Sequence, residues 1–340
     1  MILAIVLFCF LGVSVLFNLG HLIESIVSIE GGSSSDAGPR LDEVLVENNG
    51  SRNKIAVLTI DGIISGQPIE ARGLTMVDVI KAQLDLAADD DRVKAVILKV
   101  DSPGGEVLAS DEIAGALRKF QNDSKKPVIV SMGSLAASGG YYVSVPCRWI
   151  VANELTITGS IGVIMESWNY RGLMDKVGLR PFTFKSGEHK DMLSGSRELS
   201  EIPEDEQKII QSFIAQAYGR FTNVVSAGRE YASEQNESEG KPLAANWNSY
   251  ADGRVLSGKE AYDLGFVDEL GNFDDAVNRA ENIAAIGNAD LIEYRQRHEL
   301  GDLLRLFGET QSRAVKLDLG VEMPKIQAGH LYYLWPTYLR

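Results

Sequence analysis

Three short apolar runs in the first half of the chain each end in a turn that contains glycine. The runs begin at Lys54, Val93 and Val128 and are rich in β-branched residues, as buried strands are. Between them, residues 76–88 and 108–120 carry apolar side chains at helical spacing. Strands that alternate with helices pair in parallel through crossover connections. We therefore expect an α/β protein with a parallel sheet at its centre.

The remainder of the chain contains weaker signals of the same two kinds. Strands are expected at residues 149–152, 180–184 and 291–294, and helices at residues 204–228 and 274–286. The polar stretch 232–248 is expected to be a loop.

The third apolar run ends in small residues that include a candidate nucleophile. Ser138 follows this run and precedes the helix-compatible segment Gly139–Tyr142. A serine at such a turn has its hydroxyl at the positive end of the helix dipole, beside N–H groups that have no partner within the helix. An oxyanion formed during acyl transfer to the serine is stabilised there. Small residues also serve only to let a helix and a strand pack closely, so this stretch alone leaves both interpretations open.

A second glycine-rich turn, Pro103–Gly105, follows the preceding strand. The carboxyl ends of neighbouring parallel strands lie at the same edge of a sheet, where ligand sites of such sheets are found. Glycine at these points lets the backbone approach a ligand closely. We therefore expect the N–H groups of Gly105 and Gly139 to form an oxyanion hole.

The N-terminal segment is the most apolar part of the chain. Residues 2–17 are almost entirely apolar, and the run continues to residue 23 with few interruptions. This length reaches that of a membrane span, and neither a basic leader nor a signal cleavage site accompanies it. We expect a transmembrane anchor at residues 1–24 and a flexible linker at residues 25–53.

Composition excludes several function classes. The net charge of −14 and a pI of about 4.8 disfavour nucleic acid as a partner. Cys9 lies in the apolar run and Cys147 in the body, so no disulfide framework is expected. The four histidines show no metal-ligand spacing, and we expect neither a metal nor a cofactor.

The base that would serve Ser138 has three candidates in one turn-rich segment. His189 could complete a Ser-His-Asp triad. The adjacent Lys190 could accept the serine proton if burial keeps its amine neutral, because desolvation lowers the pKa of lysine. Lys185 is a competing candidate, and most lysines are solvated surface groups.

Several motifs resemble those of the signal peptide peptidase A family of serine–lysine proteases, in the family's order and within residues 54–285. They are Asp101–Gly105, Gly133–Tyr142, Thr158–Val163, Lys185–Asp191, and Asp252–Val255 with Val267–Gly271. The resemblance implies that Ser138 is the nucleophile, that Lys190 is the general base, and that Ser160 holds the lysine amine in position. It also implies that the amides of Gly105 and Gly139 form the oxyanion hole.

The same resemblance leads to expectations about the fold, the membrane attachment and the substrates. It implies a ClpP/crotonase-like superhelix of βαβ repeats over residues 54–295. The C-terminal extension at residues 296–340 has no counterpart in the family's motifs, and we expect its apolar and aromatic residues to dock on the body or on a neighbouring subunit. The resemblance further implies a single-pass, membrane-anchored homo-oligomer with its catalytic domain outside the cytoplasm. Peptide substrates would be the remnants of cleaved signal peptides.

Two alternative functions are weighed against a peptidase. The same scaffold could perform crotonase-like acyl-CoA chemistry, but that would leave Ser138 and Lys190 without a role. A non-catalytic membrane scaffold would be favoured by loss of either residue, and both are present.

Overall fold

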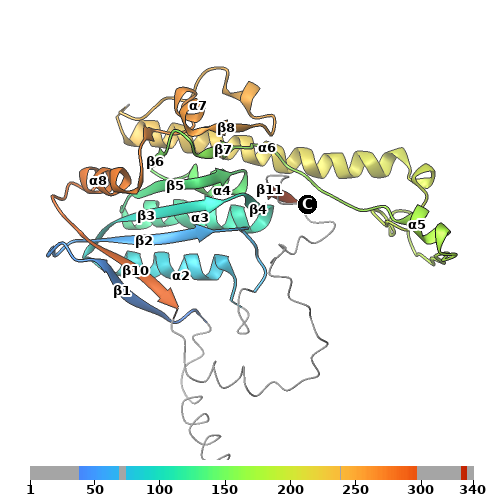
Figure 1. Ribbon diagram of the computed structural model, residues 1–340, viewed down its shortest axis with the longest axis horizontal. Helices are drawn as coiled ribbons and strands as arrows, with labels where there is room; N and C mark the ends of the chain where they lie inside the picture. Colours follow the sequence, from blue (N-terminus) through green and yellow to red (C-terminus); the bar gives the residue numbers. More distant parts are fainter. Residues whose placement is uncertain (1–37, 69–73, 238, 297–330, 335–340) are drawn as a thin grey trace, which may run out of the picture. The chain divides into compact units, whose positions relative to one another are not determined.

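The structure, a computed structural model, describes residues 38–68, 74–237, 239–296 and 331–334. Strands and helices alternate through the first half of the chain (Figure 1). In chain order they are β1 (Leu41–Glu47), β2 (Lys54–Asp61), α2 (Met76–Asp89), β3 (Val93–Ser102), β4 (Gly104–Glu106), α3 (Val107–Ser124), β5 (Val128–Ala137), α4 (Gly139–Ser144), β6 (Trp149–Ala152) and β7 (Ile157–Gly159).

The second half is dominated by one long helix. The elements are α5 (Arg171–Lys176), the 3-10 turn η1 (Leu199–Glu201), α6 (Glu204–Gln235), the 3-10 turn η2 (Trp247–Tyr250), β8 (Val255–Ser257), α7 (Gly258–Asp263), β9 (Glu269–Leu270), α8 (Phe273–Ile283), β10 (Asp290–Gln296) and β11 (Tyr332–Leu334).

The central strands pair as the sequence predicts. β2, β3, β5 and β6 are parallel neighbours in that order. β10 extends the sheet beside β2, and β1 pairs antiparallel with β10 at that edge. β7 bonds to β5 and to β8. The carboxyl ends of β3 and β5 therefore lie side by side, and β4 and α4 follow directly from them. The expected mixed α/β fold is confirmed.

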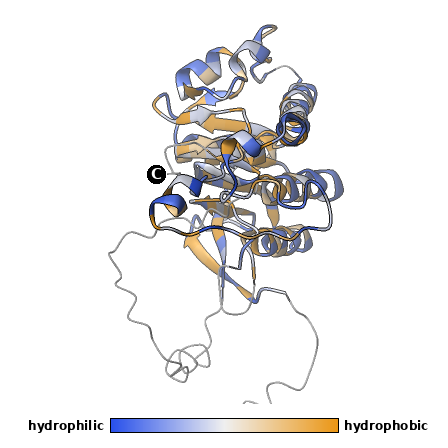
Figure 2. Cartoon of the chain, turned by 90° about the vertical axis from the view of Figure 1, so that its right-hand side faces the viewer, coloured by the Kyte–Doolittle hydropathy of each residue, from blue (hydrophilic) through white to orange (hydrophobic). Residues whose placement is uncertain are grey.

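Helices cover both faces of this sheet. Ile80 of α2, Leu117 of α3 and Phe221 of α6 belong to one buried cluster, together with side chains of the strands. Ala276 and Ala280 of α8 pack on the opposite face. Figure 2 shows the hydrophobic strands between the more polar helices. Each fully buried large aliphatic side chain contributes about 1.5–3 kcal/mol to folding relative to an exposed one.

Several elements differ from the sequence-based expectation. The strand expected at residues 180–184 does not form, and Phe182 and Phe184 are 86% and 87% exposed. High β-propensity makes a strand only where a partner strand and a packed face are available. The helix expected to end at residue 228 continues to Gln235, into the stretch predicted to be a loop.

Part of the segment expected to be a flexible linker is a strand. β1 lies within residues 25–53 and pairs with β10, about 250 residues away in sequence. Leu41 packs against the buried cluster, and the Lys54 amine lies 2.6 Å from the Glu43 carboxylate. This pairing depends on a distant strand, so the local composition of the segment could not reveal it.

The C-terminal extension contributes a strand to the body. Tyr332–Leu334 pairs antiparallel with β4, in a small sheet separate from the main one. All three side chains are buried. The expectation that aromatic residues of this extension dock on the body is thus confirmed for β11.

The expected anchor at residues 1–24 lies outside the described residues. Within the described ranges, no helix is long and apolar enough to cross a bilayer.

A buried ion pair joins α6 to the sheet. The Arg229 guanidinium and the Asp268 carboxylate are 1% and 0% exposed, and their hydrogen bond measures 2.8 Å. Asp268 also accepts a bond from the Ile150 N–H, and Arg229 donates to the Gly265 carbonyl. We predict that Asp268→Ala lowers the free energy of unfolding by about 3–5 kcal/mol, because it leaves the guanidinium buried without its counter-charge.

The matched control for this prediction is an exposed ion pair. Lys259 and Asp263 on α7 are both more than half exposed, so Asp263→Ala should change the free energy of unfolding by less than about 1 kcal/mol. Urea titration of both variants measures the difference. Equal effects would show that the buried pair is not a major source of stability.

Candidate functional site

Ser138 lies at a sharp turn between β5 and α4. Its backbone has φ 55° and ψ −114°, a conformation that residues other than glycine rarely adopt. Two hydrogen bonds hold the turn: the Ser138 N–H donates to the Gly159 carbonyl at 2.8 Å, and the Tyr142 N–H donates to the Ser138 carbonyl at 2.8 Å. Strained residues of this kind persist where the surrounding structure holds them and cluster at functional sites.

The two glycine-rich turns meet at Ser138. A methyl group added to Gly139 would lie 2.9 Å from the Gly105 amide nitrogen, and one added to Gly104 would lie 2.6 Å from the Gly139 amide nitrogen. Gly104 has φ 101°, which favours glycine as well. A side chain at Gly104 or Gly139 would therefore clash with the backbone of the other turn. The structure brings the amides of Gly105 and Gly139 together, as an oxyanion hole requires.

Two side chains of the motif Asp101–Gly105 hold this arrangement. The Asp101 carboxylate accepts a hydrogen bond from the Leu135 N–H at 3.0 Å, which ties the end of β3 to β5. The Ser102 hydroxyl accepts one from the Gly104 N–H at 3.1 Å, which shapes the turn into β4.

A third motif places Ser160 next to Ser138. Thr158 on β7 donates its hydroxyl to the Ala136 carbonyl at 2.7 Å, so β7 is fixed against the end of β5. Ser160 follows with φ 50°, and its N–H donates to the Arg254 carbonyl at 2.7 Å. The motif that begins at Asp252 is thereby joined to the site.

Ser138 and Ser160 line the same pocket, of about 370 Å³. Its walls are mainly apolar or backbone: Ile161, Gly162, Val163, Ile164, Ile214, Tyr218, Ala251, Gly253 and Leu334. The exception is Asp252, whose pKa is lowered to about 2 by hydrogen bonds from the Arg254 side chain and backbone. This carboxylate is therefore ionised throughout the neutral pH range.

Lys190, the predicted base, is not among the residues that line this pocket. It is an exposed residue of the irregular segment between α5 and α6. Figure 1 shows α5 away from the sheet, beyond the N-terminal end of α6. Its neighbour His189 lies 3.7 Å from the Glu206 carboxylate, and Glu206 precedes Ile214 of the pocket by eight helical residues. Eight residues span about 12 Å of helix. Lys190 therefore does not line the pocket of Ser138 in its own chain, and the residue beside it contacts the N-terminal part of α6.

The two competing bases lie in the same segment. The Lys185 amine is paired with the Asp191 carboxylate at 2.8 Å and with the Glu188 carbonyl at 2.8 Å. His189 faces Asp205 and Glu206. Neither residue lines the serine pocket. Of the residues that the structure describes, none forms a hydrogen bond or ion pair with the Lys190 amine.

One polar side chain at the site was missed by sequence reasoning. Ser110 of α3 is fully buried, and its hydroxyl has no hydrogen-bond partner among the described residues. A methyl group at Gly139 would lie 2.8 Å from that hydroxyl oxygen. No local signal distinguishes this serine, because it occupies an ordinary position in an amphipathic helix.

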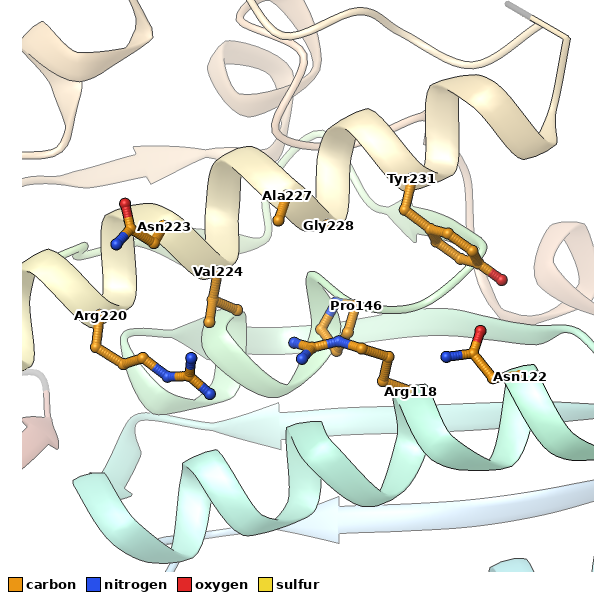
Figure 3. Close-up of a pocket in the computed structure, with 9 residues that line it drawn as sticks. All are labelled: Arg118, Asn122, Pro146, Arg220, Asn223, Val224, Ala227, Gly228 and Tyr231. Atoms are coloured by element: carbon orange, nitrogen blue, oxygen red, sulfur yellow. The ribbon is translucent and has the colours of Figure 1, made fainter.

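A second hollow, of about 350 Å³, lies between α3 and α6 (Figure 3). Arg118, Arg220 and Tyr231 line it, and it shares no residue with the Ser138 pocket. Arg220 is paired with Asp111 at 3.0 Å. This hollow is not part of the catalytic arrangement.

A strained serine at a helix N-terminus, beside two converging backbone amides, defines the class of serine hydrolases that form acyl-enzymes. Comparison with known sequences then gives the family. Residues 120–287 match peptidase family S49. A protein of Enterococcus faecium with the provisional description signal peptide peptidase SppA is 36% identical over 258 residues, which cover 75% of this chain and 71% of that protein. The chain belongs to peptidase family S49 and is a serine endopeptidase.

One further sequence relative and two solved structures are also similar to this chain. Protease 4 of Haemophilus influenzae is 38% identical over 234 residues, 68% of this chain and 35% of that protein. Among solved structures, a mutant of the 1510-N membrane-bound stomatin-specific protease has a TM-score of 0.42 at 17% identity and covers 73% of this chain and 100% of that chain. A ClpP1 mutant of Listeria monocytogenes has a TM-score of 0.37 at 17% identity and covers 65% of this chain and 94% of that chain. The family match and the relatives identified by sequence give no support to the acyl-CoA or scaffold alternatives.

Proposed function

We propose that this serine endopeptidase uses Ser138 as its nucleophile and Lys190 as its general base to cleave apolar peptides such as remnants of signal peptides. The observation that carries the proposal is the position of Ser138, at a strained turn beside the amides of Gly105 and Gly139. That position exposes a nucleophile to donors that stabilise a developing oxyanion. The ClpP/crotonase-like superhelix implied by the sequence motifs belongs to the same proposal.

The proposed reaction has two steps. The Ser138 oxygen attacks the scissile carbonyl carbon while the neutral Lys190 amine accepts the hydroxyl proton. The oxyanion takes hydrogen bonds from the Gly105 and Gly139 N–H groups, the C–N bond breaks, and the lysine returns the proton to the leaving amine. Water, activated by the same amine, then hydrolyses the ester. In this scheme Ser160 positions the amine.

Lys190 is proposed to act on the serine of a second copy of the chain. The segment that carries it, residues 165–203, exposes an unusual number of large apolar side chains. They include Trp168, Leu173, Val177, Leu179, Phe182 and Phe184, each more than half exposed. Exposed apolar patches of this kind are typical of protein interfaces. A neighbouring subunit would cover this surface and receive Lys190 at its own pocket, so the enzyme would be a homo-oligomer.

The proposed substrate class rests on the apolar walls of the serine pocket and on the apolar segment at residues 1–24. An enzyme tethered at a bilayer by that segment would meet apolar peptides released there. The catalytic domain would lie on the extracytoplasmic side.

The test is cleavage of two synthetic peptides of equal length, one with an apolar signal-peptide core and one with polar residues in its place. Mass spectrometry of the products should show internal cleavage of the apolar peptide at a rate at least roughly tenfold higher, since apolar contacts of one or two side chains contribute about 1–3 kcal/mol. Equal rates would contradict the proposed substrate class. No cleavage of either peptide by the intact oligomer would contradict the proposed activity.

A further inference from the structure

The hollow between α3 and α6 is lined by two arginines from opposite sides. Arg118 reaches into it from α3 and Arg220 from α6, and Figure 3 shows the two side chains pointing toward one another. None of the described residues that line this hollow carries a carboxylate. The whole chain has a net charge of −14, so two arginines in one hollow are a local exception to its acidic character. Converging guanidinium groups repel each other, and an anion bound between them removes that repulsion.

Arg118 supplies a guanidinium group that the described part of the chain does not use. Its side chain is exposed and forms no hydrogen bond or ion pair with any residue that the structure describes. The next residue, Lys119, is paired with Asp123 at 2.7 Å and does not line the hollow. An arginine presents N–H donors in a planar fork, which fits a carboxylate through two parallel hydrogen bonds. The fork of Arg118 is therefore available to an anion from outside.

Arg220 is held in place by a carboxylate of α3. Asp111 accepts hydrogen bonds from Arg220 Nε at 3.1 Å and from Nη2 at 3.4 Å, which leaves Nη1 for a ligand. The Tyr142 hydroxyl also donates to Asp111 and so fixes this carboxylate. A cation that is already held by hydrogen bonds loses little conformational freedom when a ligand binds to it.

The remaining walls of the hollow indicate which kind of anion it fits. The buried residues Pro146, Val224 and Gly228 give it an apolar floor. The exposed side chains of Asn122 and Asn223 add neutral N–H donors at its edge. An inorganic anion would contact the arginines but would leave the apolar floor unused. A peptide that ends in an apolar residue would use both, through its C-terminal carboxylate and its last side chain.

We propose that this hollow binds apolar peptides by their C-terminal carboxylate, with Arg118 and Arg220 as the anion-binding groups. The inference rests on the proposed peptidase function, because each internal cleavage releases one fragment that ends in a new carboxylate. It adds a second peptide site, which shares no residue with the Ser138 pocket and takes products rather than substrates.

The test is the binding of a labelled Ala-Leu-Val peptide to the full chain, measured by fluorescence polarisation. Arg118→Gln removes the unpaired charge and should raise the Kd of this peptide at least roughly tenfold, because the forked pair with the carboxylate is lost. Ala227→Phe keeps both arginines but fills the hollow, and it should also weaken binding. Lys119→Gln is the matched control: it removes a charge from the same helix outside the hollow and should leave Kd within roughly twofold.

The same peptide with a C-terminal amide identifies the recognised group. It should bind wild type at least roughly tenfold more weakly and should not respond to Arg118→Gln. Equal binding of the two peptides, or a Kd that both Arg118→Gln and Ala227→Phe leave unchanged, would overturn the inference. Displacement of the peptide by sodium phosphate but not by sodium acetate, at equal ionic strength, would show a phosphate site instead. If no protein cleaves any peptide, the proposed activity fails, while the binding measurement still decides this inference.

Discussion

Replacement of Ser138 by alanine should lower kcat/KM for an apolar peptide at least roughly 10³-fold, because the variant lacks the proposed nucleophile and retains only substrate binding and the proposed oxyanion hole. KM should change little, since the side chain is small and makes few contacts with the ground-state substrate. The fold should survive, because the strained turn is held by backbone hydrogen bonds to Gly159 and from Tyr142. Steady-state kinetics with the purified protein measures the effect.

Ser144→Ala is the matched control for this variant. Ser144 lies on α4, six residues after Ser138, is equally buried, and donates its hydroxyl to the Gly140 carbonyl at 2.7 Å. Its loss should cost no more than about 1–2 kcal/mol of stability and leave kcat/KM within roughly twofold. Residual activity of Ser138→Ala above a few per cent of wild type, with Ser144→Ala unaffected, would exclude Ser138 as the nucleophile.

The second prediction with a large effect concerns which copy of the chain supplies the proposed general base to Ser138. Lys190→Ala alone should also lose activity by at least roughly 10³-fold, because no group remains to accept the serine proton. Co-expression of Lys190→Ala with Ser138→Ala chains should restore about one quarter of the wild-type rate. The reason is statistical: half of the serines and half of the neighbouring lysines are intact, and the proposed oligomer would pair them at random.

Lys185→Ala co-expressed with Ser138→Ala provides the comparison. The Lys185 amine is already paired with Asp191, so Lys185→Ala alone should retain most of the activity. A mixed oligomer of Ser138→Ala and Lys190→Ala that stays inactive would show that the base and the nucleophile come from one chain. Activity of Lys190→Ala alone would show that another residue is the base.

Much of the catalytic arrangement could be predicted because it is built by local geometry at strand ends. The alternation of strands and helices predicts which strands are parallel neighbours, and therefore which turns meet. Pro103–Gly105 and Ser138–Gly139 follow adjacent strands β3 and β5, so their contact follows from topology. Thr158 and Ser160 lie next to these two turns because β7 pairs with β5. No local sequence pattern predicts that pairing.

Other features depended on partners far away in sequence. β1 forms only because β10 offers an edge, and the aromatic segment at residues 180–184 stays irregular because no strand is available beside it. Ser110 becomes a polar group of the site only through the packing of α3 against the turn of Ser138. Each of these depends on a tertiary contact that local propensity and periodicity do not encode.

By itself, the sequence determined the α/β class, the central parallel pairing and the residues around Ser138, because hydrophobic periodicity and glycine turns act over a few neighbouring residues. Only the tertiary structure decided that Lys190 does not line the pocket of Ser138 in its own chain and that Tyr332–Leu334 pairs with β4. The physical reason is that both placements depend on how distant segments pack: the segment of Lys190 packs near the N-terminal part of α6, and an edge of β4 pairs with the C-terminal strand.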